Sequence, residues 1–268
     1  MNLPKSVVQI LEMVEKTSEK PVKIVETPHL HGGFAKSRAA TQDMPESIIF
    51  LNSQYKDYYD YLVAHEALHI ARFFSVPSEQ RRYFHSTNLM IAQAVEQLFS
   101  ENTELLQVPD FDKVIPFLMM CAENILNAVN SMPQDFIVDQ YVYQNCPEVK
   151  NSQTAILDHL HGIIMRSVKH PSFNHNPPTI SGRVLVFNHV FFEIINSIIK
   201  SDYQIPLEQG LQLPADQLKQ KTLQQLQSAQ DHVDDRLLIN LWGTHFKVRH
   251  WFDWIEPDHV TTEHFSNK

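Results

Sequence analysis

Glycine is scarce in this sequence, with only 6 copies among 268 residues. Loop-rich β-sandwiches and nucleotide sites built on glycine turns both need backbone conformations that glycine adopts most readily. The one adjacent pair, Gly32-Gly33, is too short a motif to indicate a phosphate-binding loop. The sequence therefore argues against both architectures.

Cysteine is rarer still, with two copies, Cys121 and Cys146. Secreted domains that depend on disulfides usually carry four or more cysteines. Both cysteines lie in apolar, helix-like contexts, and neither has a histidine close to it in the sequence. The sequence therefore indicates neither a disulfide framework nor a thiol nucleophile beside a histidine.

Basic charge is in deficit, because 22 lysines and arginines face 31 aspartates and glutamates, for a net charge of −9. Such a chain has no general attraction for nucleic acid or for anionic lipid. We therefore expect no nucleic acid and no membrane among its partners.

Long uninterrupted hydrophobic runs are also absent. The most apolar segment, RVLVFNHVFFEIINSIIK, is broken by Asn188, His189 and Glu193, which favours a buried helix over a membrane span. The N-terminal stretch carries Glu12 and Glu15 among its apolar positions, so it is typical of an amphipathic helix and not of a signal peptide. These features predict a soluble protein in a reducing, cytoplasmic setting.

Helical periodicity, in contrast, is abundant. Residues 21–52 favour two or three short strands, the last of them SIIFLN at residues 47–52. Beyond them, apolar residues at helical spacing are separated by prolines. The predicted helices cover residues 56–75, 79–106, 111–130, 133–145, 151–168, 182–200, 214–229 and 231–241. The sequence thus predicts an α+β fold that is predominantly α-helical.

A shift in composition near Pro147 divides the chain. We expect residues 1–150 to form a core that includes the strands, and residues 151–268 to form a helical C-terminal part packed on it. The end of the chain, WGTHFKVRHWFDWIEP, gathers three tryptophans, which favours an element docked on the core over an exposed partner surface.

The segment YLVAHEALHI (residues 61–70) contains the pattern H-E-x-x-H. Residues four apart share one face of a helix, so His65 and His69 can direct two imidazoles at one point. Zn²⁺ binds imidazole nitrogen at about 2.0–2.1 Å and lowers the pKa of a bound water toward roughly 7. A neighbouring carboxylate can then accept a proton as the water attacks a carbonyl. The pattern therefore predicts a zinc site with Glu66 as the general base.

Chance is the competing explanation, because the chain has 15 histidines. An accidental H-E-x-x-H has a probability on the order of one in twenty in such a chain. The context favours the metal site: the pattern is helical, a short apolar strand precedes it, and Leu62, Val63 and Leu68 predict that the helix is buried. An unpaired glutamate in a buried helix is costly.

A third ligand is expected from another helix, since catalytic zinc usually has three protein ligands and one open position. Asp135 and Asp139 lie four apart in the apolar stretch PQDFIVDQY. Asp135 is the first candidate for the ligand, and Asp139 is expected to hold the far nitrogen of a ligand histidine. Asp139 itself, Glu96 and Glu123 remain alternative ligands. Asp135 has a second explanation, because Pro133 is typical of a helix start, where an aspartate interacts favourably with the helix dipole.

With these motifs the chain resembles the zincin metallopeptidases. The resemblance rests on HEALH, on the strand before it and on PQDFIVD, over roughly residues 20–147. PQDFIVD is similar to the pattern N-I-A-x-D-x-x-I-N of bacterial zincin-related metallopeptidases, whose aspartate is the third ligand. That aspartate corresponds to Asp135, and Asp139 takes the place of the following asparagine. The interval from Asn130 to Asp135 is one residue longer than in that pattern.

The resemblance implies a zinc-dependent hydrolase that cleaves peptide or protein substrates, with SIIFLN binding extended substrate at its edge. Two alternatives stay open. One is a regulatory or interaction protein on a zincin scaffold, with a structural or lost metal site. The other is a metal-dependent hydrolase of non-peptide amides. The sequence does not specify the oligomeric state.

Other polar residues are secondary candidates. His29 and His31 would form a second metal pair, although a turn before Gly32-Gly33 is the simpler explanation. A donor to a developing oxyanion is also expected in a hydrolase. The residues considered for it are His159, His161, His170, His175, His189, Tyr141 and Tyr143. The sequence does not choose among them.

Overall fold

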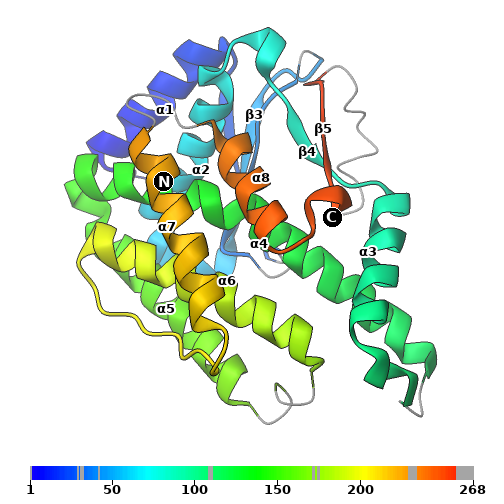
Figure 1. Cartoon of the computed structure of the whole chain (residues 1–268). Coiled ribbons are helices and arrows are strands. Elements are labelled where there is room, and N and C mark those ends of the chain that lie inside the picture. The colour runs from blue at the N-terminus through cyan, green and yellow to red at the C-terminus, as the bar shows by residue number, and fades with distance from the viewer. Residues whose placement is uncertain are drawn as a thin grey trace. The chain divides into compact units, whose positions relative to one another are not determined.

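The computed structural model describes residues 2–28, 30, 33–41, 43–107, 111–170, 173, 176–228 and 234–257. These residues are predominantly helical, with a small β-sheet (Figure 1). The predicted α+β class with mostly helical content is therefore confirmed.

The chain forms two compact units made of interleaved segments. The first unit comprises Met1–Tyr83, Ile137–His159 and Trp254–Lys268, and the second comprises Phe84–Phe136 and Leu160–Asp253. The expected division into residues 1–150 and a helical part of residues 151–268 packed on them stays a prediction.

The first unit contains a three-stranded sheet and the helix that carries HEALH. The elements are α1 (Lys5–Ser18), β1 (Val22–Thr27), β2 (Ala35–Arg38), β3 (Ser47–Asn52), the 3-10 helix η1 (Ser53–Tyr58) and α2 (Tyr59–Ser75). Helix α2 packs against α1, β2 and β3. Apolar side chains of α1, β3 and α2, together with Val138, Val142 and Ile156, form one buried core. This core fixes α2 on the sheet.

The rest of the chain is mostly helical. Its elements are η2 (Ser78–Gln80), β4 (Tyr83–His85), α3 (Asn88–Glu101), η3 (Thr103–Gln107), α4 (Phe111–Asn145), η4 (Pro147–Val149), α5 (Lys150–Lys169), α6 (Pro178–Ile199), α7 (Gln212–Ser228), α8 (Asp235–His245), η6 (Arg249–Trp251) and β5 (Asp253–Ile255). Helices α5 to α8 lie close to their predicted positions; the first three residues of the predicted helix 231–241 lie outside the described part of the chain.

Strand β3 has the predicted bounds, but it is the central strand of the sheet. It pairs in parallel with β1, from Val22 opposite Ser47 to Thr27 opposite Asn52, and antiparallel with β2. The expectation that SIIFLN binds extended substrate at its own edge is therefore wrong, because its neighbours occupy both edges. The outer strands are β1 and β2.

Helix α2 begins later than expected, because the chain leaves β3 through η1. The Asn52 side-chain oxygen accepts a hydrogen bond from the Gln54 N–H at 3.1 Å and caps this 3-10 helix. Helix α2 ends at Ser75, where Val76 is extended and is followed by Pro77. The helix predicted over 56–75 is thus confirmed except for its first residues.

The helix predicted over 79–106 is wrong in its first third, where the chain forms η2 and then strand β4, which pairs with β5. Helix α3 begins only after Thr87, whose hydroxyl accepts a hydrogen bond from the Met90 N–H at 3.2 Å. Threonine is a favoured N-cap, and this cap sets the start of the helix.

The two helices predicted over 111–130 and 133–145 are one continuous helix, α4, with Pro116 and Pro133 inside it. A proline in a helix lacks an N–H and crowds the carbonyl one turn earlier. Here Val129 and Phe136, both fully buried, extend one apolar face across Pro133. Burial of that face outweighs the local cost, and the predicted break at Pro133 is wrong.

Helix α6 is the one described helix that is long and apolar enough to cross a membrane by length and composition. However, 56% of its most apolar window is buried inside the protein, and it packs against α7. Such burial is typical of the core helix of a soluble protein, as predicted.

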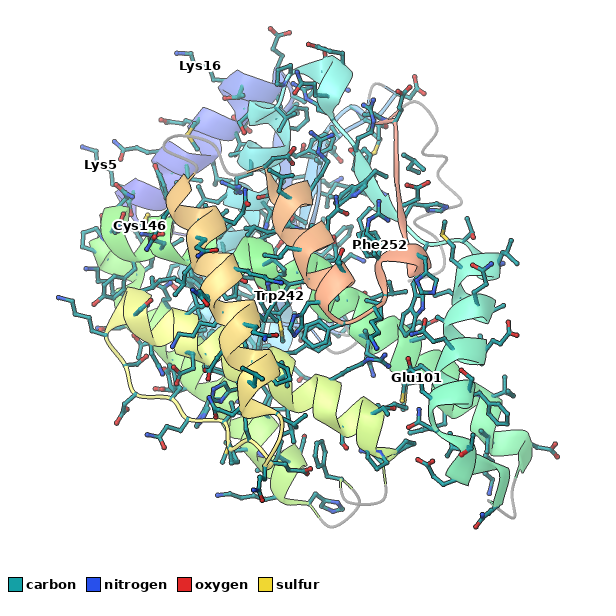
Figure 2. The ribbon with its side chains drawn as sticks, in the orientation of Figure 1. Lys5, Lys16, Glu101, Cys146, Trp242 and Phe252 are labelled. Atoms are coloured by element: carbon teal, nitrogen blue, oxygen red, sulfur yellow. The ribbon has the colours of Figure 1, made fainter. Side chains whose placement is uncertain are left out.

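The aromatic C-terminal segment forms part of the core of the second unit. Trp242, Trp251 and Phe252 are buried (Figure 2 labels Trp242 and Phe252). The Trp242 indole N–H donates to the Thr222 hydroxyl at 3.0 Å, so its polar atom is satisfied. The expectation of a docked element, and not an exposed aromatic surface, is confirmed for these residues.

Replacing Gly243 in α8 by alanine is expected to destabilise the protein by about 1–3 kcal/mol through overpacking. A Cβ there would lie 2.9 Å from two ring atoms of Phe252, and that ring is buried. Gly162→Ala in α5 is the matched control, since its Cβ would meet only the flexible end of Arg166. Urea unfolding of both variants measures the difference; equal midpoints would contradict the close contact.

Candidate metal centre

His65 and His69 face each other on α2. Their Nε2 atoms are 3.1 Å apart, and their rings are inclined at 67°. Tetrahedral zinc with bonds of about 2.05 Å places its donor atoms about 3.3 Å apart. Both side chains are half-buried. The predicted convergence of the two imidazoles therefore occurs, with the nitrogen spacing that a shared cation requires.

Asp135 lies with this histidine pair. One donor atom from each of His65, His69 and Asp135 lies within 4.8 Å of the other two. Asp135 stands one turn before Asp139 on the continuous helix α4. Because Asp135 is deep inside that helix and not in its first turn, the helix-dipole explanation for it does not apply.

Two alternative candidates for the third ligand, Glu96 and Glu123, do not lie with the histidine pair. Glu96 on α3 and Glu123 on α4 are both exposed, and neither belongs to the His-His-Asp group found among the described residues. They behave as solvated helix positions.

Asp139 lies behind His65, away from His69. It is 1% exposed, and its Oδ1 is 3.3 Å from His65 Nδ1. A proton on Nδ1 that is donated to this carboxylate leaves Nε2 with its lone pair directed at His69. The contact with His65 is thus present, and the role expected of Asp139, in which it orients a ligand histidine, stays a prediction.

Two residues that the sequence did not indicate complete this arrangement. The Tyr61 hydroxyl donates to Asp139 Oδ1 at 2.7 Å and lies 3.2 Å from His65 Nδ1. The Gln153 side-chain amide donates to Asp139 Oδ1 at 3.2 Å and to its backbone carbonyl at 3.0 Å. Tyr61 precedes His65 by one helical turn, a spacing from which it could have been found; Gln153, on α5, carries no such signal.

Glu66 follows His65 on α2 and is half-buried. Among the described residues its carboxylate takes part in no hydrogen bond or ion pair. A carboxylate in that state keeps its oxygens available to accept a proton.

The other nucleophile and donor candidates have ordinary surroundings. Burial raises the pKa of Cys121 to about 11 and also raises the pKa of Cys146, so both thiols stay protonated near neutral pH. His161 and His189 each form a hydrogen bond with a backbone carbonyl. Tyr141 is exposed, and the Tyr143 ring contacts the Lys150 ammonium.

Among the described residues, no group that could hold a metal was found other than His65, His69 and Asp135. His159 packs against the rings of Phe34 and Tyr55, and His170 lies at the end of α5. His29, His31 and His175 lie outside the described residues, so the second metal pair stays a prediction, and so does the oxyanion donor.

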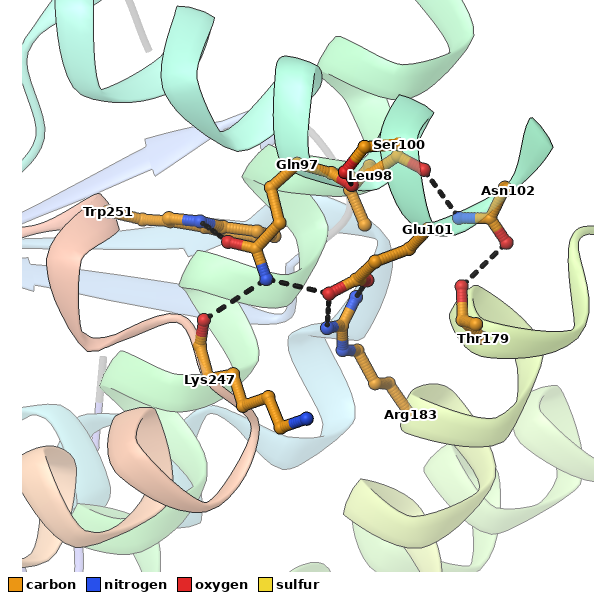
Figure 3. Close-up of polar contacts among 9 residues, drawn as sticks. All are labelled: Gln97, Leu98, Ser100, Glu101, Asn102, Thr179, Arg183, Lys247 and Trp251. Carbon is orange, nitrogen blue, oxygen red and sulfur yellow. Dashed lines mark hydrogen bonds and ion pairs between the residues drawn. The ribbon is translucent and has the colours of Figure 1, made fainter. Parts of the chain in front are cut away.

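A second polar cluster, in the second unit, was also not predicted (Figure 3). Arg183 pairs with Glu101 through two contacts, at 2.8 and 3.1 Å. Gln97 links Glu101 to the Trp251 indole. Burial raises the pKa of Glu101, but the bonds from Arg183 and Gln97 outweigh it, so its pKa is lowered. With its charges paired internally, this cluster ties α3 to α6 and η6 and is structural.

Comparison with protein-family models, with curated proteins and with solved structures finds no match to this chain.

Proposed function

We propose that the protein is a zinc-dependent hydrolase, most simply a metallopeptidase of the H-E-x-x-H type. The observation that carries the proposal is the convergence of donor atoms from His65, His69 and Asp135 within 4.8 Å. Two imidazoles and one carboxylate form a donor set typical of catalytic zinc.

In this proposal each side chain has a distinct task. Zn²⁺, when bound, would acidify water and polarise the carbonyl group of the substrate. Glu66 would accept a proton from the attacking water and deliver it to the nitrogen that leaves as the C–N bond breaks. Asp139 would keep the His65 ring in the orientation in which Nε2 faces the metal.

The number of ligands favours a catalytic site over the alternative of a structural site in a regulatory protein. The donor group has three members among the described residues, whereas structural zinc sites are closed by four. A fourth tetrahedral position is thus left for water. The Glu66 carboxylate, which has no partner within the described part of the chain, supports the same assignment, because a structural site needs no base.

The partners follow from this function. We propose a peptide or protein substrate, with no nucleic acid and no membrane as binding partner. The cytoplasm, as a reducing compartment, suits the two free thiols of Cys121 and Cys146.

The test combines metal content with hydrolysis. The purified protein is expected to contain zinc at about one equivalent by elemental analysis and to cleave members of a mixed peptide library. Chelation should abolish cleavage, and added Zn²⁺ should restore it. Iron in place of zinc would contradict the assignment, since two histidines and a carboxylate also suit Fe²⁺. Zinc with hydrolysis of simple amides alone would indicate the non-peptide alternative.

A further inference from the structure

Three hydrogen-bonding groups converge on a single carboxylate oxygen behind the proposed metal site. Oδ1 of Asp139 is 2.7 Å from the Tyr61 hydroxyl, 3.2 Å from Gln153 Nε2 and 3.3 Å from His65 Nδ1. The Tyr61 hydroxyl contacts His65 Nδ1 as well, at 3.2 Å. The shortest of these contacts is therefore made by Tyr61, and not by the histidine that the carboxylate orients.

Gln153, on α5, holds the same carboxylate of Asp139 by hydrogen bonds. Its Nε2 bridges the backbone carbonyl and the side-chain Oδ1 of Asp139, which ties the rotamer of Asp139 to its own backbone. Gln153 is fully buried, and its Oε1 has no hydrogen-bond partner among the residues that the structure describes. A buried oxygen without a partner destabilises a fold. A contribution to stability alone thus explains the buried amide poorly. Its hydrogen bonds to Asp139 indicate that it holds this carboxylate in place.

We propose that Tyr61 and Gln153 are positioning residues that hold Asp139 so that His65 keeps its proton on Nδ1 and presents Nε2 to the metal. This role rests on the proposed zinc site. Oδ1 of Asp139 accepts the hydrogen bonds of Tyr61 and Gln153, so the oxygen that faces the imidazole is an acceptor. His65 Nδ1 must then be the donor, and one tautomer is selected before any metal arrives.

The first test compares two tyrosines on the same helix. Tyr61→Phe removes the hydroxyl that contacts Asp139, and Zn²⁺ affinity, measured by competition with a chromogenic chelator, is expected to fall about tenfold. Tyr59→Phe is the matched control, because the buried Tyr59 hydroxyl has no hydrogen-bond partner in the described part of the chain. The zinc affinity of this variant should equal that of the unmodified protein. Equal affinities in all three proteins would overturn the positioning role and leave the proposed zinc site standing.

The second test separates positioning from structural support. Gln153→Leu removes the amide that holds Asp139 and keeps a side chain of similar size. Zinc affinity should fall about tenfold without a matching loss of thermal stability. The double variant Tyr61→Phe, Gln153→Leu should approach a hundredfold loss. A fall in melting temperature with unchanged zinc affinity would instead assign these side chains a structural role.

The third measurement needs no metal. Long-range ¹H–¹⁵N spectra of the histidine side chains should show His65 of the metal-free protein as the Nδ1–H tautomer, and a mixture of tautomers in Tyr61→Phe. An Nε2–H tautomer in the unmodified protein would overturn the proposal. Because this readout holds even for a protein that binds no zinc, failure of the zinc site and failure of the positioning role are distinguishable.

Discussion

Replacing Glu66 by glutamine is expected to lower the rate of hydrolysis by about 10²–10⁴-fold while zinc stays bound. Glutamine has nearly the same size and keeps a hydrogen-bonding side chain, but it cannot accept and return a proton at neutral pH. His65, His69 and Asp135 are unchanged in this variant, so the metal content should not change. The loss should appear in kcat, because proton transfer belongs to the chemical step.

The matched control is Glu96→Gln, which makes the same chemical change at an exposed position of α3. Its activity and zinc content should equal those of the unmodified protein. Peptide cleavage and elemental analysis of the same samples give both numbers. Full activity of Glu66→Gln would remove the glutamate mechanism, and loss of zinc in that variant would show that Glu66 is a ligand and not the base.

Local patterns predicted which side chains come together better than they predicted the topology. The i, i+4 spacing alone places His65 and His69 on one face of a helix, because the geometry of α2 leaves them no other arrangement. The pair Asp135 and Asp139 was found by the same spacing on a second apolar helix. These predictions needed only the periodicity of a helix and the chemistry of the side chains.

Errors arose where a single local signal competed with tertiary packing. Pro133 predicts a break between two helices, but Val129 and Phe136 bury one face on both sides of it. The position of SIIFLN in the sheet depends on β1 and β2, and strand order is not encoded in the alternation of any one strand. The helix predicted from residue 79 failed because the Thr87 cap starts it later.

The contact between Gln153 and Asp139 could not be predicted from the sequence, for a related reason. Gln153 approaches Asp139 from α5, so only the packing of two helices brings them together. A glutamine in a helix usually indicates a solvated position, and nothing in its neighbours marks it as buried. Spacing within a helix can therefore indicate candidate ligands, whereas a contact such as that of Gln153 with Asp139 depends on the folded core.

Removing one ligand is expected to remove the metal. His69→Ala deletes an imidazole whose Nε2 is 3.1 Å from that of His65, and Asp135→Ala deletes the carboxylate of the group. Each loss should exceed the roughly 10–100-fold fall in affinity that follows removal of an outer partner such as Tyr61. At micromolar protein both variants should therefore be purified with little or no zinc.

Glu123→Ala is the control that decides the third ligand, because Glu123 is an exposed carboxylate on the same helix as Asp135. It should retain zinc at the level of the unmodified protein. Zinc retained in Asp135→Ala but lost in Glu123→Ala would reverse the assignment. Zinc retained in His69→Ala would mean that the two imidazoles do not share a cation. The hydrolase proposal would then lose the metal site on which it depends.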